Sequence, residues 1–256
     1  MTDKCDPIKQ ISEKNPWYVD DHFSKQYKRP GPRAVIENRW KIFGRVLTEF
    51  LQSSHTASST RPIRILDAGC GDGINLFGLG NMVQGQEWNA HFFATDYNPL
   101  RIERATKFSF VKNICQSSLD ALPYSGGLFD LVLCSQVLEH IPQDKKVLQE
   151  LKRVIRPGGI LILGVPNEGC FLGWLRNHVI QRSILRTTDH VNFYTEQSIS
   201  SLLDSVGFPI VKIEKAGFFF PHLALHHLLS FVAPGRRLIQ ILGKVWESQS
   251  AELSSL

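Results

Sequence analysis

Glycines at every second position follow a short apolar run near the start of the chain. The run IRILDA spans residues 63–68 and contains Asp67, and Gly69, Gly71 and Gly73 alternate directly behind it. A side chain at these positions would hinder a positive φ angle or keep a ligand away from the backbone, and glycine avoids both problems. The pattern predicts a strand, a turn that binds a polar ligand, and the start of a helix.

The spacing of these glycines argues against a dinucleotide site. A G-x-G-x-x-G fingerprint needs its third glycine at the position where this chain has Ile74. A second apolar run, at residues 91–95, ends in Asp96. A carboxylate at that strand end can accept hydrogen bonds from both hydroxyls of a ribose, so we expect Asp96 to face a ribose.

The D-x-G-x-G-x-G turn together with Asp96 resembles the class I S-adenosylmethionine (SAM) dependent methyltransferases, in particular the small-molecule group that includes the ubiquinone-pathway O-methyltransferases. The resemblance covers residues 33–215. It implies SAM as cofactor and transfer of a methyl group to a small or lipid-like acceptor, with oxygen as the favoured atom. Two alternatives stay open: a methyltransferase fold that binds ligand without turnover, and another transfer, such as aminopropyl transfer, on the same fold.

The strand ends supply the expected cofactor contacts. Asp67 would orient the turn or accept the methionine ammonium, and the resemblance implies that Asp96 holds the ribose while Tyr97 flanks the adenine. Segment 117–124 would lie over the adenine edge. There Ser118 replaces an acidic residue of many relatives, and its oxygen can still accept from the adenine amino group without charge assistance. The expected cofactor-binding residues are Asp67, Gly69, Cys70, Gly71, Gly73, Asp96, Tyr97, Ser118, Leu119 and Gln136.

Two histidines are candidate catalytic bases. The fourth predicted strand leads to Gln136, Glu139 and His140, and the resemblance implies that Gln136 touches SAM while His140 faces the acceptor. A neutral imidazole near pH 7 suits deprotonation of a hydroxyl. Alternatively, Glu139 and His140 only cap the next helix. His190, in a segment similar to the His-x-x-x-Tyr-Thr stretch of the family, is the second candidate, unless it merely bonds a backbone carbonyl.

A metal requirement is not expected. Some ubiquinone-pathway relatives have acidic residues at both positions that Gln136 and Glu139 occupy here, a pattern linked to a divalent metal. A carboxamide is a poorer ligand than a carboxylate for a hard cation. The sequence therefore predicts no required metal.

Apolar spacing predicts the elements that position these residues. An apolar face predicts a helix over 33–51, and a helix capped by Thr195 ends at Gly207. Between them strands and helices alternate, which indicates an α/β fold with a doubly wound, mostly parallel sheet. Alternation at 210–213 predicts a sixth strand, and a seventh has only a weak candidate at 238–242. The expected strands are 63–67, 91–96, 109–113, 128–134 and 159–165, the last after an Arg-Pro-Gly-Gly turn, and the helices are 73–83, 98–108 and 143–156.

The length of 256 residues and the 43% apolar content suit one α/β domain with additions. We expect an N-terminal arm or lid at 1–32, a SAM-binding domain at 33–215 with an acceptor-side insertion at 167–194, and an apolar C-terminal cover at 216–256. A lid would exclude water from the reaction, whereas an arm would only pack on the surface. The aromatic residues of this arm are Trp17, Tyr18, Phe23 and Tyr27.

Composition and charge limit the classes of partner that we expect for this protein. The net charge of +5 is mild and forms no basic stripe interleaved with aromatics, so no nucleic acid is expected. Five scattered cysteines and a polar N-terminus indicate reduced thiols in a cytoplasmic protein. Segment 171–186, apolar with interspersed arginines, could form a basic amphipathic helix, and segment 217–232 is about as apolar but too short and broken to span a bilayer. Both would cover the acceptor pocket, contact a membrane surface peripherally, or serve as ordinary core helices.

Overall fold

The structure is a computed structural model that describes residues 20–52, 61–83, 89–167 and 190–215. Its centre is a five-stranded parallel sheet with the order β3-β2-β1-β4-β5. The chain moves outward from β1 first to one edge and then to the other, so the predicted doubly wound architecture is confirmed. The strands are β1 (Ile63–Ala68), β2 (Ala90–Asp96), β3 (Val111–Gln116), β4 (Phe129–Ser135) and β5 (Ile155–Gly164).

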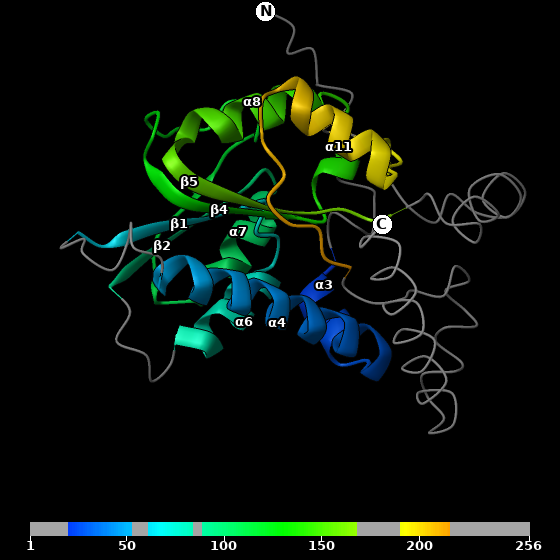
Figure 1. Cartoon of the computed structure of the whole chain (residues 1–256). Helices are drawn as coiled ribbons and strands as arrows, with labels where there is room; N and C mark the ends of the chain where they lie inside the picture. The colour runs from blue at the N-terminus through cyan, green and yellow to red at the C-terminus, as the bar shows by residue number, and fades with distance from the viewer. Residues whose placement is uncertain (1–19, 53–60, 84–88, 168–189, 216–256) are drawn as a thin grey trace, which may run out of the picture.

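Helices cover both faces of the sheet (Figure 1). Successive side chains of a strand point to opposite faces, and the packing follows this rule. Ile63 and Ile65 of β1 pack in one cluster with residues of α4 (Pro30–Gln52), whereas Leu66 and Ala68 pack with residues of α8 (Asp144–Val154). The sheet is therefore buried on both sides, as expected for parallel strands. The face covered by α4 also carries α3 (His22–Tyr27), α6 (Ile74–Val83) and α7 (Pro99–Ala105), and the face covered by α8 also carries α11 (Glu196–Ser205).

The boundaries of two strands differ from the prediction. β3 begins at Val111 rather than 109, because residues 108–111 form a turn in which the Val111 N–H donates to the carbonyl of Phe108 (3.1 Å). β5 begins at Ile155 and includes the Arg-Pro-Gly-Gly stretch expected to be a turn. Its register with β4 shifts at this point and Gly158 has a φ of +76°, so the glycine produces an irregularity within the strand.

The predicted sixth strand at 210–213 is wrong. Within the described residues this segment pairs with no strand and β5 is the edge of the sheet. Val211 is 93% exposed, and Glu214 forms ion pairs with Arg45 and Lys212. Alternation of apolar and polar residues indicates an extended chain whether or not that chain pairs with a neighbouring strand, so the pattern alone does not establish a strand.

Several expected segments lie outside the described residues: Trp17, Tyr18, the apolar stretches 171–186 and 217–232, and the weak strand candidate 238–242. In the described part of the chain, no helix has the length and apolar character needed to cross a membrane.

The short helix α3 is hydrogen-bonded to the glycine turn. Asp72 lies between Gly71 and Gly73, is 4% exposed, and accepts bonds from the backbone N–H groups of His22 (2.7 Å) and Phe23 (3.4 Å). Arg104 of α7 donates to Asp72 (3.1 Å) and to the carbonyl of Asp20 (3.0 Å). One buried carboxylate therefore joins the N-terminal helix α3 to the glycine turn.

Aromatic packing supports the same attachment. Phe23 and Tyr27 stack with ring centroids 5.5 Å apart, and both lie 5.4 Å from the ring of Phe77 on α6. Tyr27 also contacts Trp40 of α4. The described part of the N-terminal arm is thus packed on the domain beside the turn, and its action as a lid stays a prediction.

We expect Asp72→Ala to release α3. The substitution removes the carboxylate that accepts from the backbone N–H groups of α3 and from Arg104, at a cost of about 1–3 kcal/mol. Trypsin should then cleave after Lys25 and Lys28 about fivefold faster or more, because proteolysis follows the population of the opened state. Asp204→Ala, a change at an exposed position of α11, is the control. Equal cleavage rates in both variants would contradict the role assigned to Asp72.

Candidate functional site

The glycine turn has the predicted backbone. Gly69, Gly71 and Gly73 have φ angles of +80°, +55° and +86°. A Cβ atom at Gly73 would lie 2.2 Å from the Phe108 ring, whereas one at Gly71 would meet nothing closer than Arg101 at 3.8 Å. The turn is therefore packed at Gly73 and open at Gly71, which leaves Gly71 as the place where a ligand can approach the backbone.

Asp96 lies directly beside this turn. One of its oxygens accepts from the Gly71 N–H (2.9 Å) and the other from the Asn98 N–H (2.9 Å). Burial raises the pKa of Asp96, while these two hydrogen bonds and the charge of Arg101 oppose the rise. A carboxylate oxygen has a second lone pair, so Asp96 can hold the turn and still accept from a ribose hydroxyl.

Asp67 is a buried carboxylate at the end of β1. It is 1% exposed, and within the described residues neither of its oxygens makes a hydrogen bond of good geometry. Burial raises the pKa of Asp67 to about 7; the nearby Asn75 side chain opposes the rise and the charge of Asp96 adds to it. Ionising a buried carboxylate that lacks hydrogen bonds is costly, so a cationic partner would strongly stabilise the charged form of Asp67.

Cys70 and Leu119 present only backbone to a ligand. The Cys70 side chain is 1% exposed and packs with Leu76, Ala94 and Ala105. Leu119 is 4% exposed and belongs to the core on the side of α8. Both positions were predicted as cofactor contacts, and the structure turns their side chains into the core.

The expected adenine end is more open. Tyr97 is 49% exposed at the end of β2, and Ser118 is exposed just beyond β3. The backbone N–H of Ser117 donates to the carbonyl of Asp96 (3.0 Å), which brings the two strand ends together. The Ser118 hydroxyl donates to the carboxylate of Asp120.

Gln136 has an unusual backbone. Its φ of +59° is the single positive value at a non-glycine position in the described chain, and its N–H donates to the carbonyl of Gly164 (2.7 Å). A left-handed conformation at a residue with a side chain costs energy and is common at functional sites. The strain lies at the carboxyl end of β4, where the sequence predicts a contact with SAM.

The two candidate bases lie together. His140 is in the 3-10 helix η1 (Leu138–His140), and its ring centroid is 4.8 Å from that of His190 in an edge-to-face arrangement. Glu139 is 1% exposed, and its carboxylate is 4.0 Å from Nε2 of His140. Segments far apart in the sequence thus form one cluster at the carboxyl edge of the sheet.

Residues around His190 hold this cluster in place. The backbone N–H groups of Val191 and Asn192 donate to the carbonyl of Glu139 (2.9 and 3.0 Å). The Asn192 amide also donates to the carbonyl of Ile141 (2.7 Å), and the hydroxyl of Tyr194 donates to Asp144 (2.9 Å). The segment predicted from its His-x-x-x-Tyr-Thr pattern therefore docks on η1, whereas Asp189 lies outside the described residues.

The proposal that Glu139 and His140 merely cap the next helix is not supported. Helix α8 begins at Asp144, its N-terminal cap residue is Gln143 rather than Glu139 or His140, and the Gln143 side chain makes no capping hydrogen bond. One ligand atom from each of Glu139, His140 and His190 lies within 4.8 Å of the others. Two imidazoles and a carboxylate suit zinc or a similar transition metal better than magnesium, so the absence of a required metal stays a prediction.

Sequence reasoning missed Arg39. Burial of this guanidinium lowers its pKa, and the negative charge of Glu139 opposes that effect. Its Nε makes no hydrogen bond within the described part of the chain. A signal was present, because Arg39 interrupts the apolar face between Ile36 and Phe43 of α4, where a charged residue needs a special reason.

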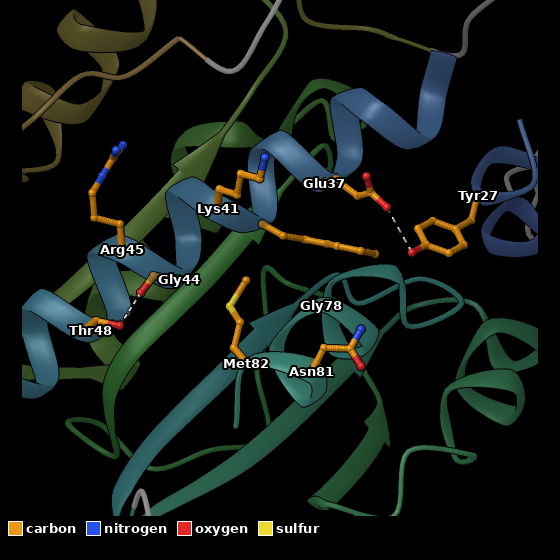
Figure 2. Close-up of a pocket in the computed structure, with 10 residues that line it drawn as sticks. Tyr27, Glu37, Lys41, Gly44, Arg45, Thr48, Gly78, Asn81 and Met82 are labelled. Carbon is orange, nitrogen blue, oxygen red and sulfur yellow. Dashed lines mark hydrogen bonds between the residues drawn. The ribbon is translucent and has the colours of Figure 1, made fainter. Parts of the chain in front are cut away.

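The cavity in Figure 2 is separate from this site. It has a volume of about 610 Å³ and lies between α4 and α6. Its lining residues include Glu37, Lys41 and Met82, and the hydroxyl of Tyr27 donates to Glu37 at its rim. None of the predicted cofactor-binding or catalytic residues lines it.

Relatives with known names share part of this chain. A ubiquinone biosynthesis O-methyltransferase of Vibrio cholerae is 27% identical over 114 residues, covering 41% of this chain and 42% of that protein. Norajmaline N-methyltransferase of Rauvolfia serpentina is 26% identical over 154 residues, covering 57% and 51%. The chain therefore spans about half the length of these curated relatives.

Solved structures with a similar arrangement include YcgJ of Bacillus subtilis, with 18% identity, a TM-score of 0.49, and coverage of 72% of this chain and 78% of that one. Another is a SAM-dependent methyltransferase of Thermotoga maritima, with 19% identity, a TM-score of 0.48, and coverage of 75% and 80%.

A family match covers most of the fold described above. The profile of the family described as "Methyltransferase domain" matches residues 39–213, which is more than half of the chain and includes the glycine turn, Asp96 and both histidines. The chain therefore belongs to this methyltransferase domain family, among the class I SAM-dependent methyltransferases.

Proposed function

We propose that this protein binds SAM on the glycine turn and transfers its methyl group to an oxygen of a small or lipid-like acceptor beside His140 and His190. The observation that carries the proposal is the hydrogen bond between Asp96 and the Gly71 N–H, because it sets a ribose-binding carboxylate against an open backbone turn. The O-methyltransferase and N-methyltransferase names of the relatives support the reaction class. Oxygen is favoured because a histidine pair can accept the proton of a hydroxyl.

The parts of SAM match the polar groups along the sheet edge. The ribose hydroxyls would bond Asp96, the adenine would lie between Tyr97 and Ser118, and the methionine ammonium would bond Asp67. The buried guanidinium of Arg39 would bind the methionine carboxylate, because its Nε makes no hydrogen bond within the described residues. Each assignment pairs a polar group of SAM with a protein group of complementary charge or hydrogen-bonding character.

Methyl transfer from SAM depends mainly on the alignment of donor and acceptor and needs few catalytic side chains. When bound, SAM would supply an electrophilic methyl group, and its transfer to the acceptor oxygen would leave the electrons of the S–C bond on sulfur and give S-adenosylhomocysteine (SAH). A neutral His140 or His190 takes the hydroxyl proton as the new bond forms. The strained backbone of Gln136 would bring its side chain to the sulfonium end of SAM.

Calorimetric titration tests the proposal directly. SAM and SAH should bind, and NADH, added as a control, should not. Asp96→Ala should weaken SAH binding about tenfold or more, because it removes the ribose acceptor and the bond that holds the turn. Asp204→Ala, at an exposed position of α11, should leave it unchanged. An Asp96 variant with wild-type affinity would refute the assigned cofactor site.

Binding should depend on pH through Asp67. Its pKa of about 7 in the free protein means that below this pH the carboxyl is mostly protonated and attracts the ligand ammonium less. SAH affinity should therefore rise from about pH 5.5 to about pH 7.5, by at most about tenfold per pH unit, and then level off. Asp67→Asn should flatten this profile, while His140→Ala should keep it. A slope that survives in Asp67→Asn would assign the titration to another group.

The base is identified by separating binding from turnover. His140→Ala or His190→Ala should slow methyl transfer to a hydroxylated apolar acceptor by about 10²-fold or more, with SAH affinity within about twofold of wild type. Initial rates with labelled SAM and calorimetry measure the two effects. Undiminished rates in both variants would rule out a histidine base, and SAM binding without transfer to any acceptor would favour the non-catalytic alternative.

A further inference from the structure

The segment after β3 has a charge arrangement of its own. Ser118 donates its hydroxyl hydrogen to one oxygen of Asp120, and the other oxygen is 2.9 Å from Nζ of Lys146 on α8. These contacts lower the pKa of Asp120, the bond from Ser118 most and the bond from Lys146 next, so the carboxylate is ionised near neutral pH. The Ser118 hydroxyl is therefore held with its hydrogen pointing to a negative charge.

Buried leucines and hydrogen bonds to α8 hold the turn that contains Ser118 and Asp120. Leu119 and Leu122 are buried on either side of Asp120, at 4% and 5% exposure. The backbone N–H of Leu122 donates to Glu150 (2.8 Å), and Arg153 donates to the Leu122 carbonyl (3.1 Å). Ser118 remains exposed above this turn, beside the strand end of Asp96.

We propose that Asp120 is a positioning residue that acts through Ser118 to make the cofactor site selective for the 6-amino group of adenine. This rests on the proposed binding of SAM at Asp96. A hydroxyl whose hydrogen is committed to Asp120 offers only lone pairs to a ligand, so it accepts from an amino group and repels a 6-oxo group. The neighbouring carboxylate also strengthens the acceptor, which makes up for the acidic residue that Ser118 replaces.

The test compares SAH with its 6-oxo analogue, S-inosylhomocysteine, by calorimetry on the full chain. Wild type should prefer SAH by about tenfold. Asp120→Asn keeps the shape but removes the charge, and it should lower the preference about three- to tenfold, since the hydroxyl can then also donate to the oxo group. Asp204→Asn, a matched change at an exposed position, should keep the wild-type preference.

A second variant protects the test against an effect of folding. Ser118→Ala should lose the preference too, and adding Asp120→Asn to it should change nothing further, because Asp120 acts only through Ser118. An unchanged preference in Asp120→Asn, or additive losses in the double variant, would overturn this inference while leaving SAM binding intact. Failure of wild type to bind SAH at all would instead overturn the proposed function, and this inference with it.

Discussion

The glycine turn between β1 and α6 is held from two sides by carboxylates, and most of the site depends on this. Asp96 accepts the Gly71 N–H from the end of β2, and Asp72, within the turn, accepts from the start of α3 and from Arg104. The backbone N–H groups of Gly69 and Cys70 also donate to the carbonyl of Thr95 (2.8 and 2.9 Å), so bonds to β2 and to α3 together fix a turn with three positive φ angles. The glycine turn, Asp96 and the N-terminal helix α3 form one hydrogen-bonded unit.

A second, separate set of hydrogen bonds holds the cluster of His140 and His190. The carbonyl of Glu139 and the amide of Asn192 tie η1 to the segment that carries His190. Both units lie at the carboxyl ends of parallel strands, because every strand of such a sheet ends at the same edge. The glycine turn and the histidine pair therefore lie at the same edge of the sheet, which suits the in-line arrangement of donor and acceptor that methyl transfer needs.

Much of the fold could be predicted because a buried parallel sheet has a strong local signature. Strands β1, β2 and β4 are runs of apolar residues bounded by polar turns, and the predicted limits agree with the structure within one residue. The errors lie at the edges. The segment 210–213 alternates between apolar and polar residues but forms no strand, and the Arg-Pro-Gly-Gly stretch is part of β5 rather than a turn. A local sequence pattern does not show whether a segment pairs with a neighbouring strand.

The sequence by itself determined the strand-turn-helix unit, the positions of Asp67 and Asp96, and the two candidate histidines, because each follows from residue type and spacing over a few residues. Only the tertiary structure decided that His140 meets His190, that Arg39 turns inward toward Glu139, and that Asp120 holds Ser118. The physical reason is the distance along the chain over which each effect acts. Backbone geometry and side-chain periodicity act between near neighbours, whereas burial, charge and hydrogen-bond partners depend on which distant segments pack together.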